Sequence, residues 1–396
     1  MQVYADNAAT TKMSRAVIEA MMPFFDQVYG NPSSLHSAGQ RAAEALQEAR
    51  ATVAACIGAG PREITFTSGG SEADNQAIWT AAKIGERKGK KHIISTAFEH
   101  HAVLHTLNRL KKEGFDVELL PVSTEGQITA EQVRQAIREE TCLVTVMYAN
   151  NEIGSILPIA EIGAVCQEKG VLFHTDAVQA AGHVAIDVAA QHIDMLTLSA
   201  HKFHGPKGVG ALYARRGIQL VNLIEGGAQE RGKRAGTENI PGIVGMAVAL
   251  KAACDNLEEN GKKVTALRDR LIDGLATIPH AILNGGQEHR LPGNVNFSFE
   301  GIEGESLLLW LDEAGISASS GSACASASLD PSHVLLAIGR QVEVAHGSVR
   351  LTLCEENTAE EVDWIIRSVR EAVERLRAMS PLWRDMVDGK KAFLLP

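Results

Sequence analysis

Residues 193–214 read IDMLTLSAHKFHGPKGVGALYA: an apolar run ends in polar residues and a lysine, a glycine- and proline-rich turn follows, and a second strand pattern begins. Lys202 is therefore expected at the end of a strand, where desolvation lowers the pKa of an amine. Such an amine can attack a carbonyl and form a Schiff base. The neighbouring hydroxyl of Ser199 and imidazole of His201 suit a phosphate. Taken alone, however, the stretch favours a simpler interpretation, a lysine that caps a strand in a turn.

The bulk composition is that of an ordinary globular protein. The chain has 396 residues, 45% of them hydrophobic and 22% charged, so we expect two domains. A formal net charge of -10 without a long basic block argues against nucleic acid or a membrane surface as partner. The sequence shows no signal-peptide pattern and no apolar run of membrane-spanning length. Six cysteines without a CxxC pair suit free thiols, and we expect a cytoplasmic protein.

Short apolar strands alternate with helical segments through the first two thirds of the chain. This alternation predicts an α/β fold with a doubly wound, mostly parallel sheet. Ligands bind such sheets at the carboxyl ends of the strands. The polar candidates that directly follow predicted strands are Gly69, Gly70, Ser71, His100, Asn151, Asp176, Ser199 and Lys202. Their shared placement favours one common site, because unrelated capping or core roles would not gather them at strand ends.

Two of these candidates also have simpler interpretations. The turn at residues 68–72 is either a phosphate cradle at a helix N-terminus or a plain strand-to-helix turn with a serine cap. His100 aligns with the apolar stripe of the next helix and is by default a core histidine. His101 and His105 share a helix face at a spacing that suits a metal, but that face continues with polar residues, so we interpret it as solvated.

The last third of the chain has a different layout. We predict a large domain at residues 13–258 and a smaller α+β domain formed by residues 1–12 and 259–396. Within it, residues 319–328 are small and polar without periodicity. Cys324, in a loop predicted at about residues 317–330, is therefore the one cysteine that we expect to be accessible. Arg350 lies on the polar side of a predicted strand. It could bind a carboxylate bidentately, although an arginine on a solvent-facing strand is commoner.

Together these residues resemble the cysteine desulfurases, fold-type I pyridoxal-phosphate enzymes of the class V aminotransferase group. The resemblance is strongest to the nitrogen-fixation and iron–sulfur-cluster type, and it extends from YADNAATT at residues 4–11 to the region of Trp383. The motifs that carry it are GNPSSLH (30–36), EH (99–100), NNEIG (150–154), DAVQ (176–179), SAHK (199–202), RAGTEN (234–239) and SSGSAC (319–324).

The resemblance implies a role for each candidate residue. Lys202 would be the Schiff-base lysine of pyridoxal 5′-phosphate, and Asp176 would pair with its pyridinium nitrogen. His100 would stack on the ring and help to move protons. Arg350 would hold the carboxylate of L-cysteine. Further contacts to the cofactor would come from Gly70, Ser71, Asn151 (which also reaches the substrate), Gln179, Ser199, His201 and, from the partner subunit of a homodimer, Thr237.

The implied reaction converts L-cysteine to L-alanine. The sulfur passes to the thiolate of Cys324 as a persulfide and then to an acceptor, such as an iron–sulfur scaffold protein. Nitrogenase maturation is a candidate pathway, since residues 388–396 look more like the nitrogen-fixation type than like scaffold-binding relatives. The protein alone supplies no metal site by this resemblance, although Cys324 could ligate a transferred iron–sulfur cluster.

Two positions depart from the family pattern, and two alternative functions remain. Ser71 replaces a threonine and keeps its hydroxyl. Cys354 replaces a small residue and is either inert, which we favour, or a second oxidisable thiol. A selenocysteine lyase or aminotransferase would share this fold, but an aminotransferase needs no Cys324. A non-catalytic scaffold protein would be expected to have lost Lys202 or Asp176, and both are present.

Overall fold

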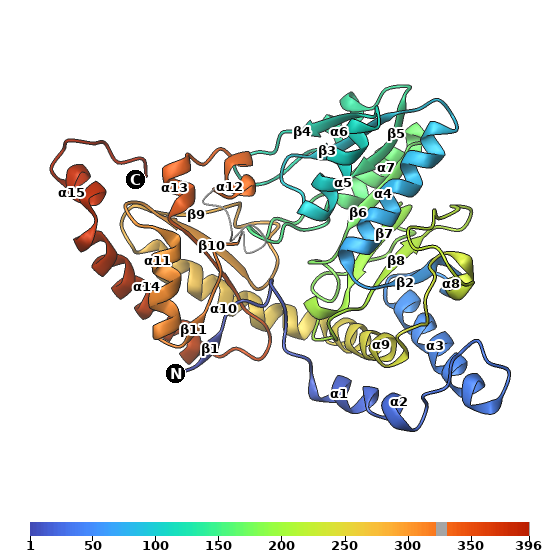
Figure 1. Cartoon of the computed structure of the whole chain (residues 1–396). Helices are drawn as coiled ribbons and strands as arrows, with labels where there is room; N and C mark the ends of the chain where they lie inside the picture. The colour runs from blue at the N-terminus through green and yellow to red at the C-terminus, as the bar shows by residue number, and fades with distance from the viewer. Residues whose placement is uncertain (322–330, 396) are drawn as a thin grey trace.

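The computed structural model describes residues 1–321 and 331–395 and shows two parts, each built on its own sheet (Figure 1). The larger sheet lies at the right of Figure 1 and the smaller one at the left, with the long helix α10 (Leu257–Ala276) reaching from one part toward the other. The loop expected at about residues 317–330 is described only up to Gly321. Cys324 therefore lies outside the described residues.

The larger sheet has seven strands in the order β2-β8-β7-β6-β5-β3-β4. Neighbouring strands are parallel except at β8, which runs antiparallel to both β2 and β7. The bounds are β2 Ile64–Thr67, β3 His92–Thr96, β4 Asp116–Leu120, β5 Thr141–Thr145, β6 Leu172–Asp176, β7 Met195–Ser199 and β8 Gly210–Ala214. Every residue of β5, β7 and β8 is buried, so both faces of the sheet are covered there. The predicted mostly parallel sheet is confirmed.

Helices connect these strands and complete the larger part. Their bounds are α1 Arg15–Met21, α2 Pro23–Asp26, α3 Ser37–Cys56, α4 Gly70–Glu86, α5 His101–Lys112, α6 Ala130–Ala136, α7 Ile159–Lys169, α8 Gln229–Gly232 and α9 Ile240–Asp255. A buried ion pair holds α8 against the sheet. Arg50 binds both carboxylate oxygens of Glu230 at 2.7 Å, and Glu230 also accepts the backbone N–H of Phe66 in β2.

The smaller part has an antiparallel sheet in the order β12-β10-β9. Its strands and helices are β9 Ala281–Leu283, β10 Asn294–Phe299, α11 Gly304–Glu313, β11 Ile316–Ser317, α12 His333–Ala337, α13 Val342–His346, β12 Ser348–Thr352, α14 Ala359–Met379 and α15 Pro381–Val387. The N-terminal strand β1 (Val3–Tyr4) pairs in parallel with β11. The N-terminal residues therefore join this part, as the sequence predicts. The boundaries at 12/13 and 258/259 stay predictions, and α10 crosses the second one without a break.

Helix α14 illustrates how the sequence determines an element. Thr358 caps its first turn, and Glu361 returns the bond to the backbone of Thr358, a capping box whose serine or threonine typically contributes about 1 kcal/mol. Val362, Ile365 and Val369 follow at helical spacing and are fully buried in the core of the smaller part. The apolar stripe thus directs the helix onto the sheet.

The C-terminal tail packs against the smaller part. The ring of Phe393 stacks on that of His280 with 3.8 Å between centroids, and the backbone N–H groups of Leu394 and Leu395 donate to the carboxylate of Glu300 at 2.7 and 3.0 Å. In the described residues, no single helix is long and apolar enough to cross a membrane. The bent pair α9 and α10 meets that test only when the two helices are taken together.

Candidate active site

A pocket of about 440 Å³ lies at the carboxyl ends of the parallel strands, closed on one side by residues of the smaller part. Ten residues proposed from the sequence line it: Gly70, Ser71, His100, Asn151, Asp176, Gln179, Ser199, His201, Lys202 and Arg350. Thr237 is exposed and is absent from this lining within the described chain. The structure therefore gathers nearly all of the predicted residues in one place.

Lys202 ends a short 3₁₀ turn (Ala200–Lys202) that directly follows β7. Its Nζ donates to the carbonyl oxygens of Ala8 and Ala9, at 2.6 and 2.8 Å. The N-terminal segment thus closes over the lysine, and Gln179 donates to the same Ala8 carbonyl at 3.0 Å. The lysine does cap a strand, as the simpler interpretation proposes, but its side chain also lines the pocket.

Asp176 is the last residue of β6 and is almost fully buried. Burial raises the pKa of its carboxyl to about 6, although the N–H of Val178 and the charge of Lys202 both act to lower it. The backbone N–H of Val178 donates to Oδ1 at 2.9 Å. A buried carboxylate held by so few donors suits a cationic partner inside the pocket.

Asp74 on α4 is a pocket residue that the sequence analysis missed. It is 1% exposed, and burial together with the charge of Asp176 raises its pKa well above the usual range. Burial therefore favours the protonated form of Asp74. The charge of Lys202 favours the ionised form of Asp176. The signal in the sequence was an acidic residue beside Ala73 and Ala77 on the apolar face of a helix.

The glycine-rich turn before α4 lies at one end of the pocket. Its N-cap is Gly69, with φ of +156° and no side-chain cap, so the interpretation as a serine-capped turn is wrong. A Cβ on Gly70 would lie 2.7 Å from Cγ2 of Val178, so only glycine allows this close approach. The free N–H groups at the start of α4, with the hydroxyls of Ser71 and Ser199 nearby, form an anion-binding cradle.

His100 caps α5 and faces the same pocket. Its Nδ1 accepts the backbone N–H of Ala102 at 3.1 Å, which leaves the ring proton on Nε2. Burial, followed by the charge of Lys202, lowers the pKa of His100 to about 4. The ring is therefore neutral at physiological pH, and its flat face can pack against another ring.

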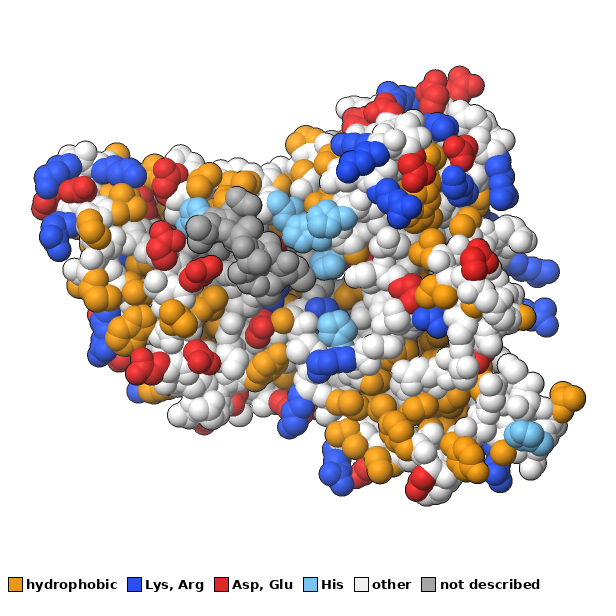
Figure 2. Space-filling view, viewed as in Figure 1, with side chains coloured by type: hydrophobic (Ala, Val, Ile, Leu, Met, Phe, Trp, Pro, Cys, Tyr) orange, Lys and Arg blue, Asp and Glu red, His pale blue; other side chains and the backbone are white. Residues whose placement is uncertain are grey.

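The neighbouring histidines are only partly solvated. The ring of His101 lies 5.0 Å from that of His105 and 4.7 Å from that of His333, between centroids. Figure 2 shows histidine side chains gathered near the middle of this face. His105 is exposed as expected, but His101 is half-buried because α12 brings His333 against it.

Arg350 comes from β12 of the smaller part and is 2% exposed, so its interpretation as a solvent-facing arginine is wrong. One terminal nitrogen donates to the carbonyl of Asn151 and the other to the carboxylate of Asp6, both at 2.9 Å. Its Nε is buried and has no hydrogen-bond partner among the described residues. An anionic group entering the pocket would satisfy that donor.

For L-cysteine, the substrate that the resemblance in the sequence implies, we expect Arg350→Lys to raise KM by about tenfold or more, because a point charge replaces a fork that binds carboxylates bidentately. Steady-state kinetics with L-cysteine and with cysteamine, which lacks the carboxylate, would measure this. Binding of cysteamine should change little in the variant. An equal rise in KM for L-cysteine and for cysteamine would show that Arg350 does not hold the carboxylate.

Comparison with known proteins identifies the family. The pattern of the aminotransferase class-V family matches residues 3–365. A cysteine desulfurase IscS from Clostridium botulinum is 55% identical over 393 residues, which cover 98% of this chain and 99% of that protein. The chain belongs to the cysteine desulfurases. This family assignment agrees with a pocket that unites a lysine, a buried carboxylate and an anion cradle.

Solved structures agree with this family. A NifS-like protein superposes with a TM-score of 0.89 at 39% identity, covering 95% of this chain and 100% of that one. The protein SspA, solved in complex with cysteine, gives a TM-score of 0.79 at 38% identity and covers 89% and 99% of the two chains. Both solved structures therefore match most of the two parts described above.

Cysteine desulfurases of this class depend on pyridoxal phosphate, and the pocket fits that group. The buried carboxylate of Asp176 suits the pyridinium nitrogen, and the start of α4 at Gly70 and Ser71 suits the phosphate. The amine of Lys202 and the face of His100 line the space between them. When bound, the cofactor supplies an electron sink for negative charge at the substrate Cα.

Proposed function

We propose that this cysteine desulfurase converts L-cysteine to L-alanine and passes the sulfur, through a persulfide on Cys324, to an acceptor for iron–sulfur cluster assembly. The observation that carries the proposal is that one pocket joins Lys202, Asp176 and Arg350. Among the described residues, the buried Nε of Arg350 has no hydrogen-bond partner. The neighbour solved with cysteine supports the same substrate.

Each of the pocket residues has a separate role in the proposed reaction. Arg350 binds the substrate carboxylate and thereby directs the Cα toward Lys202. The amine of Lys202 takes the proton from Cα as a general base. Asp176 would keep the nitrogen of the cofactor ring protonated, and the neutral His100 would pack against that ring. The N-terminal segment at Ala8 and Ala9 accepts hydrogen bonds from the lysine and lines the pocket beside it.

The sulfur step is assigned to Cys324. Its thiolate attacks the substrate sulfur, so that an S–S bond forms while the Cβ–S bond breaks, and protonation of the remaining carbon skeleton yields alanine. The chain reaches the pocket shortly before this residue. Gly321 lines it, and Ser319 exchanges two backbone hydrogen bonds with Arg350, at 3.2 and 2.6 Å.

We expect Cys324→Ala to lose sulfur transfer from L-cysteine by about 100-fold or more, since the nucleophile itself is removed. Mass spectrometry after incubation with L-cysteine should find a persulfide on Cys324 in the wild type. Cys254→Ala removes a half-buried thiol that does not line the pocket and serves as the control. Wild-type transfer by Cys324→Ala would refute the role, whereas retained turnover of selenocysteine alone would indicate a selenocysteine lyase.

The functional unit is proposed to be a homodimer. Figure 2 shows hydrophobic side chains gathered over α1, α2 and α9 at the lower right. Met22, Phe25 and Tyr29 are 57%, 60% and 74% exposed, and covering such residues favours association. Thr237 is exposed, which suits its proposed use in the pocket of a partner subunit.

Two finer points of the proposal concern the cell. The cytoplasm is the proposed location, on the cysteine spacing alone. Nitrogenase maturation is proposed as the pathway only on the resemblance of residues 388–396. Because Phe393 and Leu395 of this tail pack against the smaller part, an acceptor would meet a docked tail rather than a free one.

A further inference from the structure

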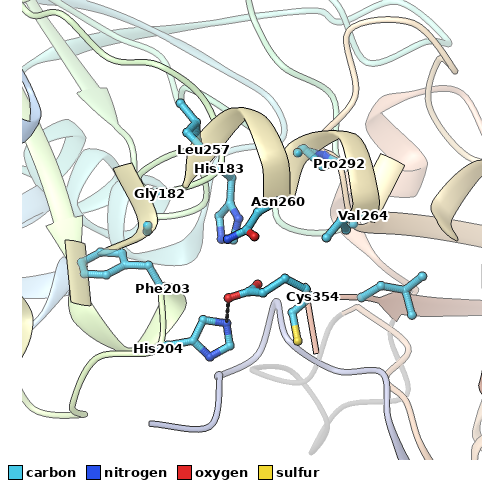
Figure 3. Close-up of a pocket in the computed structure, with 14 residues that line it drawn as sticks. Gly182, His183, Phe203, His204, Leu257, Asn260, Val264, Pro292 and Cys354 are labelled. Carbon is cyan, nitrogen blue, oxygen red and sulfur yellow. Dashed lines mark ion pairs between the residues drawn. The ribbon is translucent and has the colours of Figure 1, made fainter. Parts of the chain in front are cut away.

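A second, smaller cavity is lined by Phe203 and His204, which directly follow Lys202 in the chain (Figure 3). Its volume is about 30 Å³, enough for one or two water-sized groups. Among the described residues, none lines both this cavity and the active-site pocket. The polar side chains that face it come from both parts of the chain: His183 and His204 from the larger, Asn260 from α10, and Cys354 and Glu355 from the segment after β12.

Three of these side chains converge. One potential ligand atom from each of His204, Cys354 and Glu355 lies within 4.8 Å of the other two. The Nε2 of His204 is 3.4 Å from Oε1 of Glu355, the ion pair drawn in Figure 3. Around a tetrahedral zinc ion with bonds of about 2.0–2.3 Å, neighbouring ligand atoms lie roughly 3.3–3.8 Å apart. The distance between His204 and Glu355 already matches that spacing, and the distances to the Cys354 sulfur are at most 4.8 Å.

His204 is held in the tautomer that a metal ligand needs. Its Nδ1 donates to the carbonyl of Lys12 at 2.9 Å, which leaves the lone pair on Nε2 when the ring is neutral. Ligating histidines typically make this second hydrogen bond. Nε2 is buried and makes no hydrogen bond within the described residues. The backbone is also fixed, since φ is +62° and the N–H donates to Thr11 Oγ1 at 2.7 Å.

We propose that His204, Cys354 and Glu355 bind a divalent metal ion of borderline softness, Zn²⁺, with a fourth position open to the cavity. One imidazole nitrogen, one thiolate and one carboxylate oxygen form a donor set that binds Zn²⁺ in preference to the harder Mg²⁺ and Ca²⁺. Cys354, which the sequence analysis interpreted as inert, is then a ligand rather than a filler of space.

Without a metal, the same groups form an ion pair. Burial opposes the charged form of His204, but interactions with Cys354 and Glu355 outweigh it and raise the pKa of His204 to about 10. A zinc ion would take the place of that proton and would also bind the deprotonated thiol. Metal binding here therefore releases protons.

A metal bound here would link the larger part, through His204, to the smaller part, through Cys354 and Glu355. His204 follows Lys202 by two residues, and Cys354 follows Arg350 by four. His183, on the same cavity, hydrogen-bonds through Nε2 to the carbonyl of Lys202 at 3.1 Å. A bound ion would thus hold the turn of Lys202 in position relative to the strand of Arg350, and it would stabilise the folded chain by mass action.

The test uses the holoenzyme of Cys324→Ser, which removes the active-site thiol as a competing ligand. Co²⁺ serves as the visible probe and Zn²⁺ as its competitor. We expect one Co²⁺ per chain with the intense visible bands of tetrahedral thiolate coordination, bleached by Zn²⁺, and a higher Tm with either ion. Cys354→Ser and His204→Asn in this background should each weaken cobalt binding by about tenfold or more.

Cys254→Ser, at a half-buried thiol outside the cavity, is the matched control and should keep the cobalt spectrum. If Cys354→Ser or His204→Asn folds poorly by circular dichroism or loses the cofactor absorbance, Glu355→Gln carries the test, because its amide keeps the shape and removes the charge. No cobalt bound to the parent holoenzyme, or the same thiolate bands in the folded ligand variants, would overturn the proposal.

Discussion

Replacing Lys202 with alanine should lower kcat for alanine formation from L-cysteine by about 10³-fold or more, in the upper range for loss of a positioned base. The amine is the one lysine side chain that the structure places in the pocket lining, among the described residues. Its loss removes both the group that takes the Cα proton and two hydrogen bonds, to Ala8 and Ala9. The release of alanine, measured by a coupled assay at saturating substrate, reports the effect.

Chemical rescue with an added amine separates the loss of the base from the loss of the hydrogen bonds to Ala8 and Ala9. A small primary amine such as methylamine can enter the space that the side chain leaves and act as a base, so it should restore part of the activity of Lys202→Ala. Methylamine cannot restore the attachment of the N-terminal segment to the side chain of Lys202. Lys251→Ala, at an exposed lysine of α9, should behave like the wild type with and without methylamine. Activity of Lys202→Ala within tenfold of the wild type would contradict the assignment.

Asp176→Asn should reduce kcat/KM by about 10²–10⁴-fold, the effect of losing one charge of a buried pair worth about 3–5 kcal/mol. An asparagine keeps the shape of Asp176 but cannot hold a neighbouring ring nitrogen protonated. Absorbance titration with pyridoxal phosphate and steady-state kinetics would measure cofactor affinity and rate separately. Both should fall.

Asp74→Asn is the matched control, because the same change is made to a second buried carboxyl in the same pocket. Burial and the charge of Asp176 raise the pKa of Asp74, so it resembles a neutral amide already. We expect a change in kcat/KM of less than about threefold, equivalent to under 1 kcal/mol. If Asp74→Asn were the more damaging variant, the charge would be on Asp74, and the assignment of Asp176 would be wrong.

Much of the fold could be predicted from local pattern. The alternation of short apolar strands with helices indicates the mostly parallel sheet, because each period reflects which faces must be buried. The direction of β8, the one antiparallel strand of the larger sheet, could not be predicted from this alternation. Its direction follows from the tight turn after Lys202, which returns the chain beside β7, and from its pairing with β2 on the other side.

The site could be predicted less completely. Strand-end placement and the family resemblance identified Lys202, Asp176 and Arg350, since chemistry at these positions needs particular residue types. Asp74 was missed because its only signal was a charge on an apolar helix face. The cluster at His204 and Cys354 was also missed, because about 150 residues separate its members in the sequence.

The sequence by itself determined which elements form, the residues at the strand ends and the family to which the chain belongs. Local hydrogen bonding and hydrophobic periodicity act over a few residues, so a short stretch of sequence is enough to predict their effect. Only the tertiary structure decided that burial raises the pKa of Asp74 and Asp176 and that the N-terminal segment covers Lys202. It also decided that Arg350 is buried, with no partner for its Nε among the described residues. Desolvation and long-range contacts set these properties, and both depend on where the folded chain brings distant residues together.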